Sequence, residues 1–286
     1  MGDSRFRRLS VPLRRRSDLH RRRLRRGVYI LPSLFTLANM FCGYACVIYA
    51  MRGEYETAAP FIGFAIILDL LDGRIARMTG TASEFGLQFD SLADVISFGM
   101  APAILAFTWG LSSLGRLGWA AAFLFVTAAA LRLARFNIQA ATGDKRYFVG
   151  MPSPAAASVP AATVYAYPYG LHDASEALPA LAMVLVPALL MVSTIRFRSF
   201  KTFDLQARRP FRVLILFAAF IIAVVTHAQI VLLVLAYGYL LSAFIGLAWS
   251  RLRRRRTSDG GDTALLPDSH PEDEEERLPP AADDLR

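Results

Sequence analysis

Four aspartates stand in two short runs of the chain, Asp69 and Asp72 in the first and Asp90 and Asp94 in the second. On a helix, a spacing of three or four residues places each pair on one face. Carboxylate oxygens are the ligands that hard divalent cations prefer, and such cations bind phosphate groups. The spacing therefore predicts that two neighbouring helices together hold one or two cations (Mg²⁺, Mn²⁺ or Ca²⁺) that can in turn hold a diphosphate.

The composition places these acids in a membrane protein. Of the 286 residues, 55% are hydrophobic and only 19% are charged, whereas soluble domains carry about 25% charged residues. The charges are also concentrated at the ends: residues 1–26 hold 11 Lys and Arg, and residues 257–286 hold 10 Asp and Glu. A soluble enzyme, a disordered protein and a secreted disulfide scaffold are excluded.

The expected fold is an all-α bundle of about eight membrane-spanning helices. A span needs about 20 largely apolar residues, and Thr226–Gln229 forms a polar break that divides the last apolar stretch in two. Arg and Lys gather on one side of the predicted spans, so we expect both termini to be cytoplasmic. The expected spans are 27–51, 57–78, 95–115 with a polar forerunner from 83, 117–137, 154–170, 177–195 and two within 213–250.

Four regions follow from this pattern. We expect a basic arm over 1–26 that lies against anionic membrane lipids rather than nucleic acid, and a catalytic membrane domain over 27–200. Two further helices are expected over 201–250, and a basic anchor with a disordered acidic tail over 251–286.

An alternative interpretation of the acids is a set of structural ion pairs, Asp72 with Arg77 and Asp90 with Arg74. It leaves the other two carboxylates without partners. It also gives no reason for glycines inside the helices beside the acids, which weaken a helix unless a ligand or a backbone approaches closely. A second alternative is an ion-coupled transporter, which would place acids near the middle of several spans.

The residues 69–94 match the pattern D-x-x-D-G-x-x-A-R-x(8)-G-x-x-x-D-x-x-x-D at every position, and in this the chain resembles the CDP-alcohol phosphotransferase family over about 31–200. The resemblance implies transfer of a substituted phosphoryl group from a CDP-linked lipid to an alcohol with release of CMP, and a homodimer. It also implies metal ligation by Asp69, Asp72, Asp90 and Asp94, with Asp94 acting also as the base, and CDP-lipid binding by Asp69, Gly73, Ala76, Arg77 and Gly86.

Three further stretches resemble the branch of this family formed by membrane-embedded phosphatidylserine synthases. They are 31–39, in which Ser33 replaces the usual Asn, 132–137, and the Gly-x-Pro-x-Pro element at 150–154. This resemblance implies CDP-diacylglycerol as the donor and L-serine as the acceptor. Within 31–39 we expect Thr36 and Asn39 to support the site.

Residues near the cytoplasmic helix ends are candidates for binding the acceptor. Arg132, Arg135, Lys145 or Arg146 would hold a carboxylate or a phosphate, and Asn137 or Ser153 would orient an ammonium group. Simpler interpretations stay open: positive-inside anchoring for the two helix-end arginines, and a plain Pro/Gly loop for 150–154. Glycerol 3-phosphate, inositol phosphate and choline stay open as alternative acceptors.

The histidines argue against a covalent mechanism. Phosphatidylserine synthases that resemble phospholipase D use a histidine nucleophile in H-x-K-x(4)-D motifs, and no histidine of this chain begins that motif. We therefore expect a direct displacement with Asp94 near the attacking hydroxyl. The Ala- and Arg-rich composition favours a bacterial inner membrane, with the site facing the cytoplasm.

Overall fold

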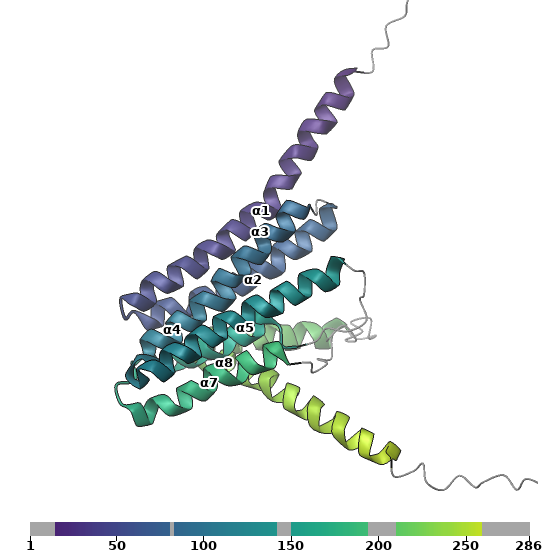
Figure 1. The fold of residues 1–286 in the computed structure, drawn as a ribbon. Helices are drawn as coiled ribbons and strands as arrows, with labels where there is room; N and C mark the ends of the chain where they lie inside the picture. Colours follow the sequence, from purple (N-terminus) through teal and green to yellow (C-terminus); the bar gives the residue numbers. More distant parts are fainter. Residues whose placement is uncertain (1–14, 81–82, 142–149, 194–209, 259–286) are drawn as a thin grey trace, which may run out of the picture. The chain divides into compact units, whose positions relative to one another are not determined.

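The computed structural model describes residues 15–80, 83–141, 150–193 and 210–258, and every regular element within them is helical (Figure 1). This confirms the expected fold class. The α-helices are α1 (Arg15–Met51), α2 (Tyr55–Thr79), α3 (Glu84–Asp94), α4 (Ala101–Trp109), α5 (Arg116–Ala141), α6 (Ser153–Ala166), α7 (Ala174–Val192) and α8 (Pro210–Ser258). A π-helix, η1 (Val95–Met100), joins α3 to α4, and a 3₁₀ helix, η2 (Leu111–Leu114), follows α4.

Several of these helices are long and apolar enough to cross a membrane. Within the described residues five qualify, over 32–51, 84–109, 116–139, 174–192 and 218–242. The predicted spans in α2 and α6 are not among them, because α2 carries two aspartates and two arginines and α6 has 14 residues. The helices are those of an integral membrane protein, and the count of eight spans stays a prediction.

The polar break in the last apolar stretch bends α8. His227 has φ −139° and ψ 52°, which interrupts the helical backbone within the predicted 226–229 segment. The sequence-based division of this stretch into two helical parts is therefore confirmed. The compact unit described below ends at Leu247.

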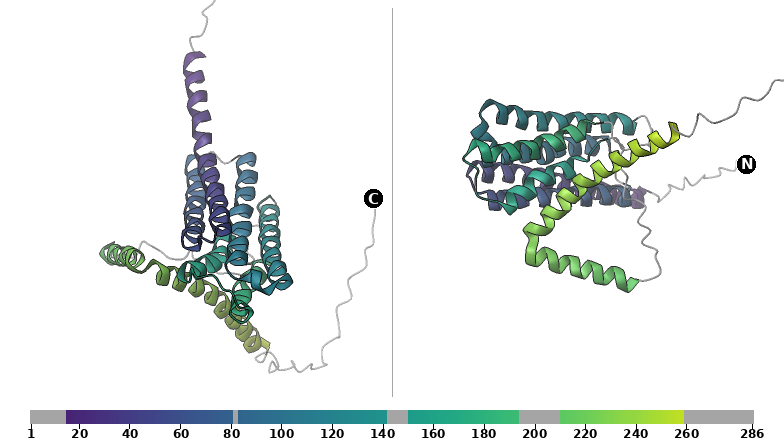
Figure 2. Two further views of the ribbon diagram at one scale, coloured as in Figure 1. Left: turned by 90° about the vertical axis from the view of Figure 1, so that its left-hand side faces the viewer. Right: turned by 90° about the horizontal axis from the view of Figure 1, so that it is seen from below.

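A short turn joins α2 to α3 and sets the relation of the two acidic runs. Gly80 ends α2 in the left-handed conformation, φ 62°, and its N–H donates to the Ala76 carbonyl. Ser83 caps α3, because its hydroxyl accepts a hydrogen bond of 3.0 Å from the Gly86 N–H. Helix α1 packs against both α2 and α3, and Figure 2 shows the three helices in one part of the bundle.

Small side chains bring the helices close together. Ala58 and Ala65 of α2 and Ala156 and Ala157 of α6 are fully buried. Alanine lets helix backbones approach closely, and close packing is the main source of association between helices in lipid. Small buried side chains therefore let α2 and α6 pack closely against each other.

The loops at one end of the bundle are fastened to one another. The Tyr55 hydroxyl donates to the Thr108 carbonyl at 2.6 Å, and the Trp109 indole N–H donates to the Tyr167 carbonyl at 2.7 Å. The Leu171 N–H donates to the Trp109 carbonyl at 2.7 Å. These bonds bring the α1–α2, α4–α5 and α6–α7 connections to the same end, and the aspartates lie toward the other.

Candidate active site

Three of the four aspartates form a compact cluster. Asp69 and Asp72 come from the last part of α2 and Asp90 comes from α3, and each offers a carboxylate oxygen within 4.8 Å of the other two. Asp72 is buried, whereas Asp69 and Asp90 are half-buried. The carboxylates of α2 and α3 therefore converge, as the spacing of the acids predicts.

The cluster fits a divalent cation. The Oδ1 atom of Asp90 is buried and has no hydrogen-bond partner within the described part of the chain. A buried carboxylate oxygen without a partner is unfavourable, and so are three like charges this close together. A cation bound by these oxygens relieves both, and an all-oxygen set suits Mg²⁺, Mn²⁺ or Ca²⁺.

Asp94 lies next to this cluster but is not part of the three-carboxylate group. It is 9% exposed, and one of its oxygens accepts a hydrogen bond of 3.4 Å from the Asn39 side chain. It interacts electrostatically with the three clustered aspartates and with Arg132. Its role as a further ligand and as the base stays a prediction.

The first membrane helix supports both acidic runs. The Thr36 hydroxyl donates to Asp72 Oδ2 at 3.1 Å, and Asn39 donates to Asp94. Both side chains are buried, Thr36 at 4% and Asn39 at 0% exposed. The two residues expected to support the site therefore contact one aspartate each.

A third contact from this helix was not anticipated from the sequence. Ser97, in the π-helix η1 directly after Asp94, donates its hydroxyl to the Asn39 carbonyl at 2.9 Å. A Cβ on Gly43 would lie 2.6 Å from Ser97 Oγ and 2.8 Å from Ser97 Cα. Glycine at this position is what lets α1 and η1 approach closely, and a single small residue in an apolar run gave no signal of it.

The CDP-lipid candidates divide into two groups. The Arg77 guanidinium lies beside Gly73, about 3.8 Å from where a Cβ on that glycine would stand, so Gly73 leaves room in front of an exposed arginine. Ala76, on the same face, is half-buried. Gly86, by contrast, has a local structural use, because its N–H completes the cap of α3.

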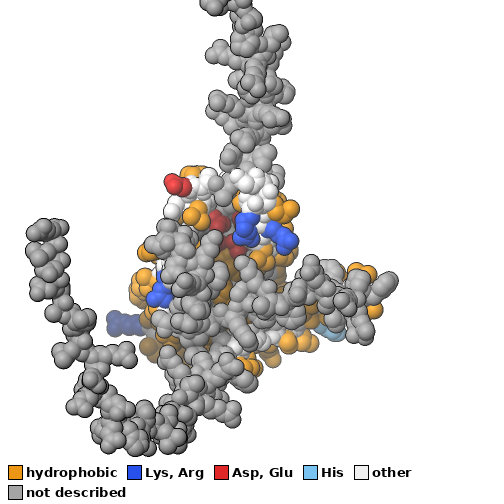
Figure 3. All heavy atoms as spheres, turned by 90° about the vertical axis from the view of Figure 1, so that its right-hand side faces the viewer, with side chains coloured by type: hydrophobic (Ala, Val, Ile, Leu, Met, Phe, Trp, Pro, Cys, Tyr) orange, Lys and Arg blue, Asp and Glu red, His pale blue; other side chains and the backbone are white. Residues whose placement is uncertain are grey.

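The interpretation of the acids as structural ion pairs is not supported. Within the described residues, Asp72 forms no ion pair with Arg77 and Asp90 forms none with Arg74. Figure 3 shows acidic and basic side chains gathered on one part of the surface, above a body of hydrophobic side chains. The carboxylates of Asp69, Asp72 and Asp90 face one another, and Arg77 interacts electrostatically with Asp69 without forming an ion pair.

Arg132 of α5 is the basic candidate that faces the aspartates. Its Nη1 donates to the Ser153 hydroxyl at 2.8 Å, and the guanidinium interacts electrostatically with Asp94 and Asp69. A guanidinium has five N–H donors, and within the described residues this one donates a single hydrogen bond. Arg132 therefore keeps donors for a bound anion while Ser153, 2% exposed, fixes one arm.

The other acceptor candidates are placed differently. Arg135 is exposed. Asn137 donates to the Ser91 hydroxyl at 2.9 Å, and its Oδ1 is buried without a partner in the described segments. Lys145 and Arg146 lie outside the described residues. The structure thus joins Arg132 to Ser153 by a hydrogen bond, whereas the Arg135 side chain is exposed.

The Gly-x-Pro-x-Pro element is a fixed support for Ser153. Gly150 has φ 92°, and a Cβ there would overlap the Met191 carbonyl oxygen. The Met151 N–H donates to the Leu190 carbonyl at 3.0 Å, and Met151 is fully buried. These contacts attach the segment to the end of α7, directly before α6 begins at Ser153.

Known proteins match the segment that carries this site. The family model described as CDP-alcohol phosphatidyltransferase matches residues 29–195. A Helicobacter pylori protein named CDP-diacylglycerol–serine O-phosphatidyltransferase is 41% identical over 175 residues, 61% of this chain and 74% of the relative. A Mycobacterium tuberculosis protein of the same name is 39% identical over 140 residues, 46% and 49% of the two chains. A Methanothermobacter thermautotrophicus archaetidylserine synthase is 36% identical over 169 residues, 58% and 69% of the two.

Proposed function

Since the chain belongs to the CDP-alcohol phosphatidyltransferase family, we propose that it is a phosphatidylserine synthase. It transfers the phosphatidyl group of CDP-diacylglycerol to the hydroxyl of L-serine and releases CMP. The observation that carries this function is the cluster of Asp69, Asp72 and Asp90, whose oxygens lie within 4.8 Å of one another. It lies in the segment matched by relatives named for transfer to serine.

The three clustered aspartates would hold Mg²⁺ or Mn²⁺, and Asp94 would complete the ligand set. When bound, the cation neutralises the diphosphate and stabilises the negative charge that develops on the departing CMP. Thr36 holds Asp72 in place through its hydroxyl. Gly73 and Ala76 would leave space for the cytidine, and Arg77 would meet a phosphate with its forked donors.

Arg132 would bind the carboxylate of serine. Its guanidinium faces Asp94 and Asp69 and is held at one arm by Ser153, so an acceptor bound to it lies next to Asp94. Asp94 takes the proton of the serine hydroxyl, and the hydroxyl oxygen forms a bond to the lipid-side phosphorus. The bond from that phosphorus to the CMP oxygen breaks in the same step, which requires no covalent enzyme intermediate.

The deciding experiment supplies the purified full-length chain with CDP-diacylglycerol and one acceptor at a time. We expect release of CMP with L-serine and Mg²⁺ or Mn²⁺, and no comparable release with glycerol 3-phosphate, inositol phosphate or choline. Release with one of these and none with serine would reassign the acceptor. No release with any acceptor would overturn the assignment of the reaction.

The proposed placement is a bacterial inner membrane with the aspartate end facing the cytoplasm. The bias of Lys and Arg supports this orientation, as does the gathering of three alternate loops at the opposite end. We further propose that α2 and α6 also span the membrane, which gives eight spans when α8 counts twice. We also propose that the basic arm over 1–26 lies against anionic lipids, that the tail within 251–286 is disordered, and that the protein forms a homodimer.

A further inference from the structure

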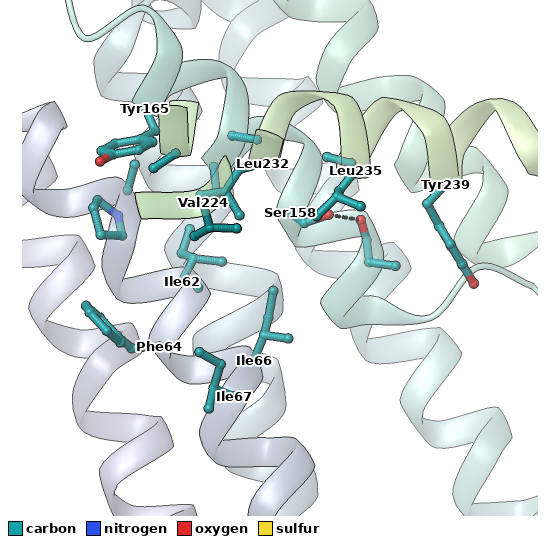
Figure 4. A pocket seen from close by; sticks show the side chains of 18 residues that line it. Ile62, Phe64, Ile66, Ile67, Ser158, Tyr165, Val224, Leu232, Leu235 and Tyr239 are labelled. Carbon is teal, nitrogen blue, oxygen red and sulfur yellow. Dashed lines mark hydrogen bonds between the residues drawn. The ribbon is translucent and has the colours of Figure 1, made fainter. Parts of the chain in front are cut away.

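Three helices enclose an apolar cavity of about 510 Å³ at the side of the bundle (Figure 4). From α2 it is lined by Gly63, Ile66 and Ile67, from α6 by Tyr165, and from α8 by Leu232. Cavities of this size in proteins hold small molecules or parts of larger ones. A cavity with so apolar a lining, within a chain that spans a membrane, is suited to hydrocarbon.

The wall formed by α8 lies outside the segment shared with the family, which ends at residue 195. A hydrogen bond of 2.9 Å between the Thr163 and Tyr237 hydroxyls fastens α8 to α6 beside the cavity. After the kink at His227, successive turns of α8 contribute Ala228, Leu232 and Leu235 to the cavity lining. The cavity is therefore a property of the whole described bundle rather than of the family segment alone.

One end of the cavity adjoins the candidate active site. On α2, Ile66 lines the cavity three residues before Asp69, so the two side chains are less than one turn apart along the helix and about 60° apart around it. On α8, Tyr239 lines the cavity and also interacts electrostatically with Arg132. A molecule whose head group is held by the aspartates can therefore extend its apolar part directly into this space.

We propose that one acyl chain of the CDP-linked lipid substrate lies in this cavity, between α2, α6 and α8. This rests on the proposed function, which places the diphosphate of that lipid at the aspartates. The cavity runs along α2 from Ala59 to Ile67, about 12 Å at the rise of an α-helix. An acyl chain attached to a head group at Asp69 enters beside Ile66 and follows α2 away from the site.

Gly63 offers a way to fill the cavity without disturbing the bundle. It lines the cavity, and a Cβ built on it meets no atom within 4 Å among the described residues. Leucine has a higher helix propensity than glycine, so Gly63→Leu favours α2 while its side chain occupies the space. Gly238→Leu is the matched control, since Gly238 is an exposed glycine of α8 with nothing within 4 Å of its Cβ and no part in the lining.

The test measures release of CMP with serine, using CDP-diacylglycerols with either long (C16–C18) or short (C6–C8) acyl chains. We expect Gly63→Leu to lower kcat/KM for the long-chain donor at least tenfold and to leave the value for the short-chain donor within about twofold of the wild type. Gly63→Ala should give an intermediate loss. Gly238→Leu should behave as the wild type with both donors.

Equal effects of Gly63→Leu on both donors, or no effect on either, would overturn the acyl-chain assignment. The occupant of the cavity would then be a membrane lipid other than the substrate. This result differs from a failure of the proposed function. If the reaction itself is wrong, the unsubstituted chain releases no CMP with serine from either donor.

Discussion

At the scale of single residues, the aspartate spacing anticipated the site well because helix periodicity converts spacing directly into a shared face. Asp69 and Asp72 lie within reach of Asp90 across the α2–α3 turn. Asp94 was grouped with them by its spacing of four, yet its carboxylate is held to one side by Asn39. Spacing determines the helix face on which a side chain lies. The position of its carboxylate oxygens depends also on its rotamer and on contacts with other helices.

Replacing a clustered aspartate tests the cation site. Asp72→Asn and Asp90→Asn keep side-chain size but remove charge, so each should lower kcat by at least about 10²-fold, as expected for loss of a group that stabilises transition-state charge. CMP release is measured while Mn²⁺ is titrated. Asp173→Asn, at an exposed position, is the control. Near-native activity of either cluster variant would remove these residues from the cation site.

Truncating Arg132 tests the acceptor site. Arg132→Ala should raise the KM for serine about tenfold to a hundredfold, the effect of losing a charged hydrogen bond worth about 1.5–3 kcal/mol. The KM for the CDP-lipid should change little. Ser153→Ala keeps the guanidinium and loses only its support, so a smaller rise is expected. Arg116→Ala, at the opposite end of the same helix, serves as control, and an unchanged serine KM in Arg132→Ala would move the carboxylate elsewhere.

At the scale of the elements, the helices were largely predictable from apolar runs, whereas their junctions were not. One span was expected after Asp94, with a polar forerunner from 83, and 84–109 is long and apolar enough to be one span; within it α3, the π-helix η1 and α4 follow one another. A π-helix depends on a change in hydrogen-bond register that leaves no periodic signal. Ser97 and Gly43, which join η1 to α1, were missed for the same reason.

The junction of α1 with η1 is tested by adding one methyl group. Gly43→Ala should force α1 away from Ser97 and weaken the contact of Asn39 with Asp94, at a cost of about 1–3 kcal/mol for overpacking. We expect a lower melting temperature and a lower kcat. Gly238→Ala controls for the substitution itself. Wild-type values for both quantities would show that the junction adjusts without affecting the site.

The support beneath Ser153 is tested in the same way. Gly150→Ala combines a left-handed backbone with overlap on the Met191 carbonyl, so it should destabilise the protein by at least about 1–3 kcal/mol. Gly115 also has a positive φ, 56°, but nothing lies within 4 Å of a Cβ built on it. Gly115→Ala therefore measures the loss of stability that comes from a positive φ without an overlap. Thermal unfolding in detergent compares the two. Equal losses would mean that the contact with α7 contributes nothing to stability.

At the scale of the whole molecule, membrane insertion and helical class followed from composition, whereas the side of each loop stays a prediction from charge. The position of α8 did not follow from composition, because an apolar helix with no motif gives no indication of its neighbours. The bond from Tyr237 and the cavity lining show that α8 lies beside α6 and α2.

The proposed orientation is open to a labelling experiment in intact cells. Cys42 and Cys46 are buried and should not react. Ser113→Cys, exposed between α4 and α5, should be labelled by a membrane-impermeant maleimide. Glu84→Cys, exposed at the start of α3, should be labelled only after the cells are opened. The reverse pattern would place the aspartates on the outer side.

The short turn from Gly80 to Ser83 has a consequence for biosynthesis. Because it lets two consecutive helices hold all the clustered carboxylates, these acids emerge from the ribosome within residues 69–94. Arg132 and Ser153 are translated later. A nascent chain that has released only its first three helices therefore already carries a complete set of clustered acids, and it must shelter them, or load them with an ion, before Arg132 and Ser153, the proposed serine-binding residues, have been made.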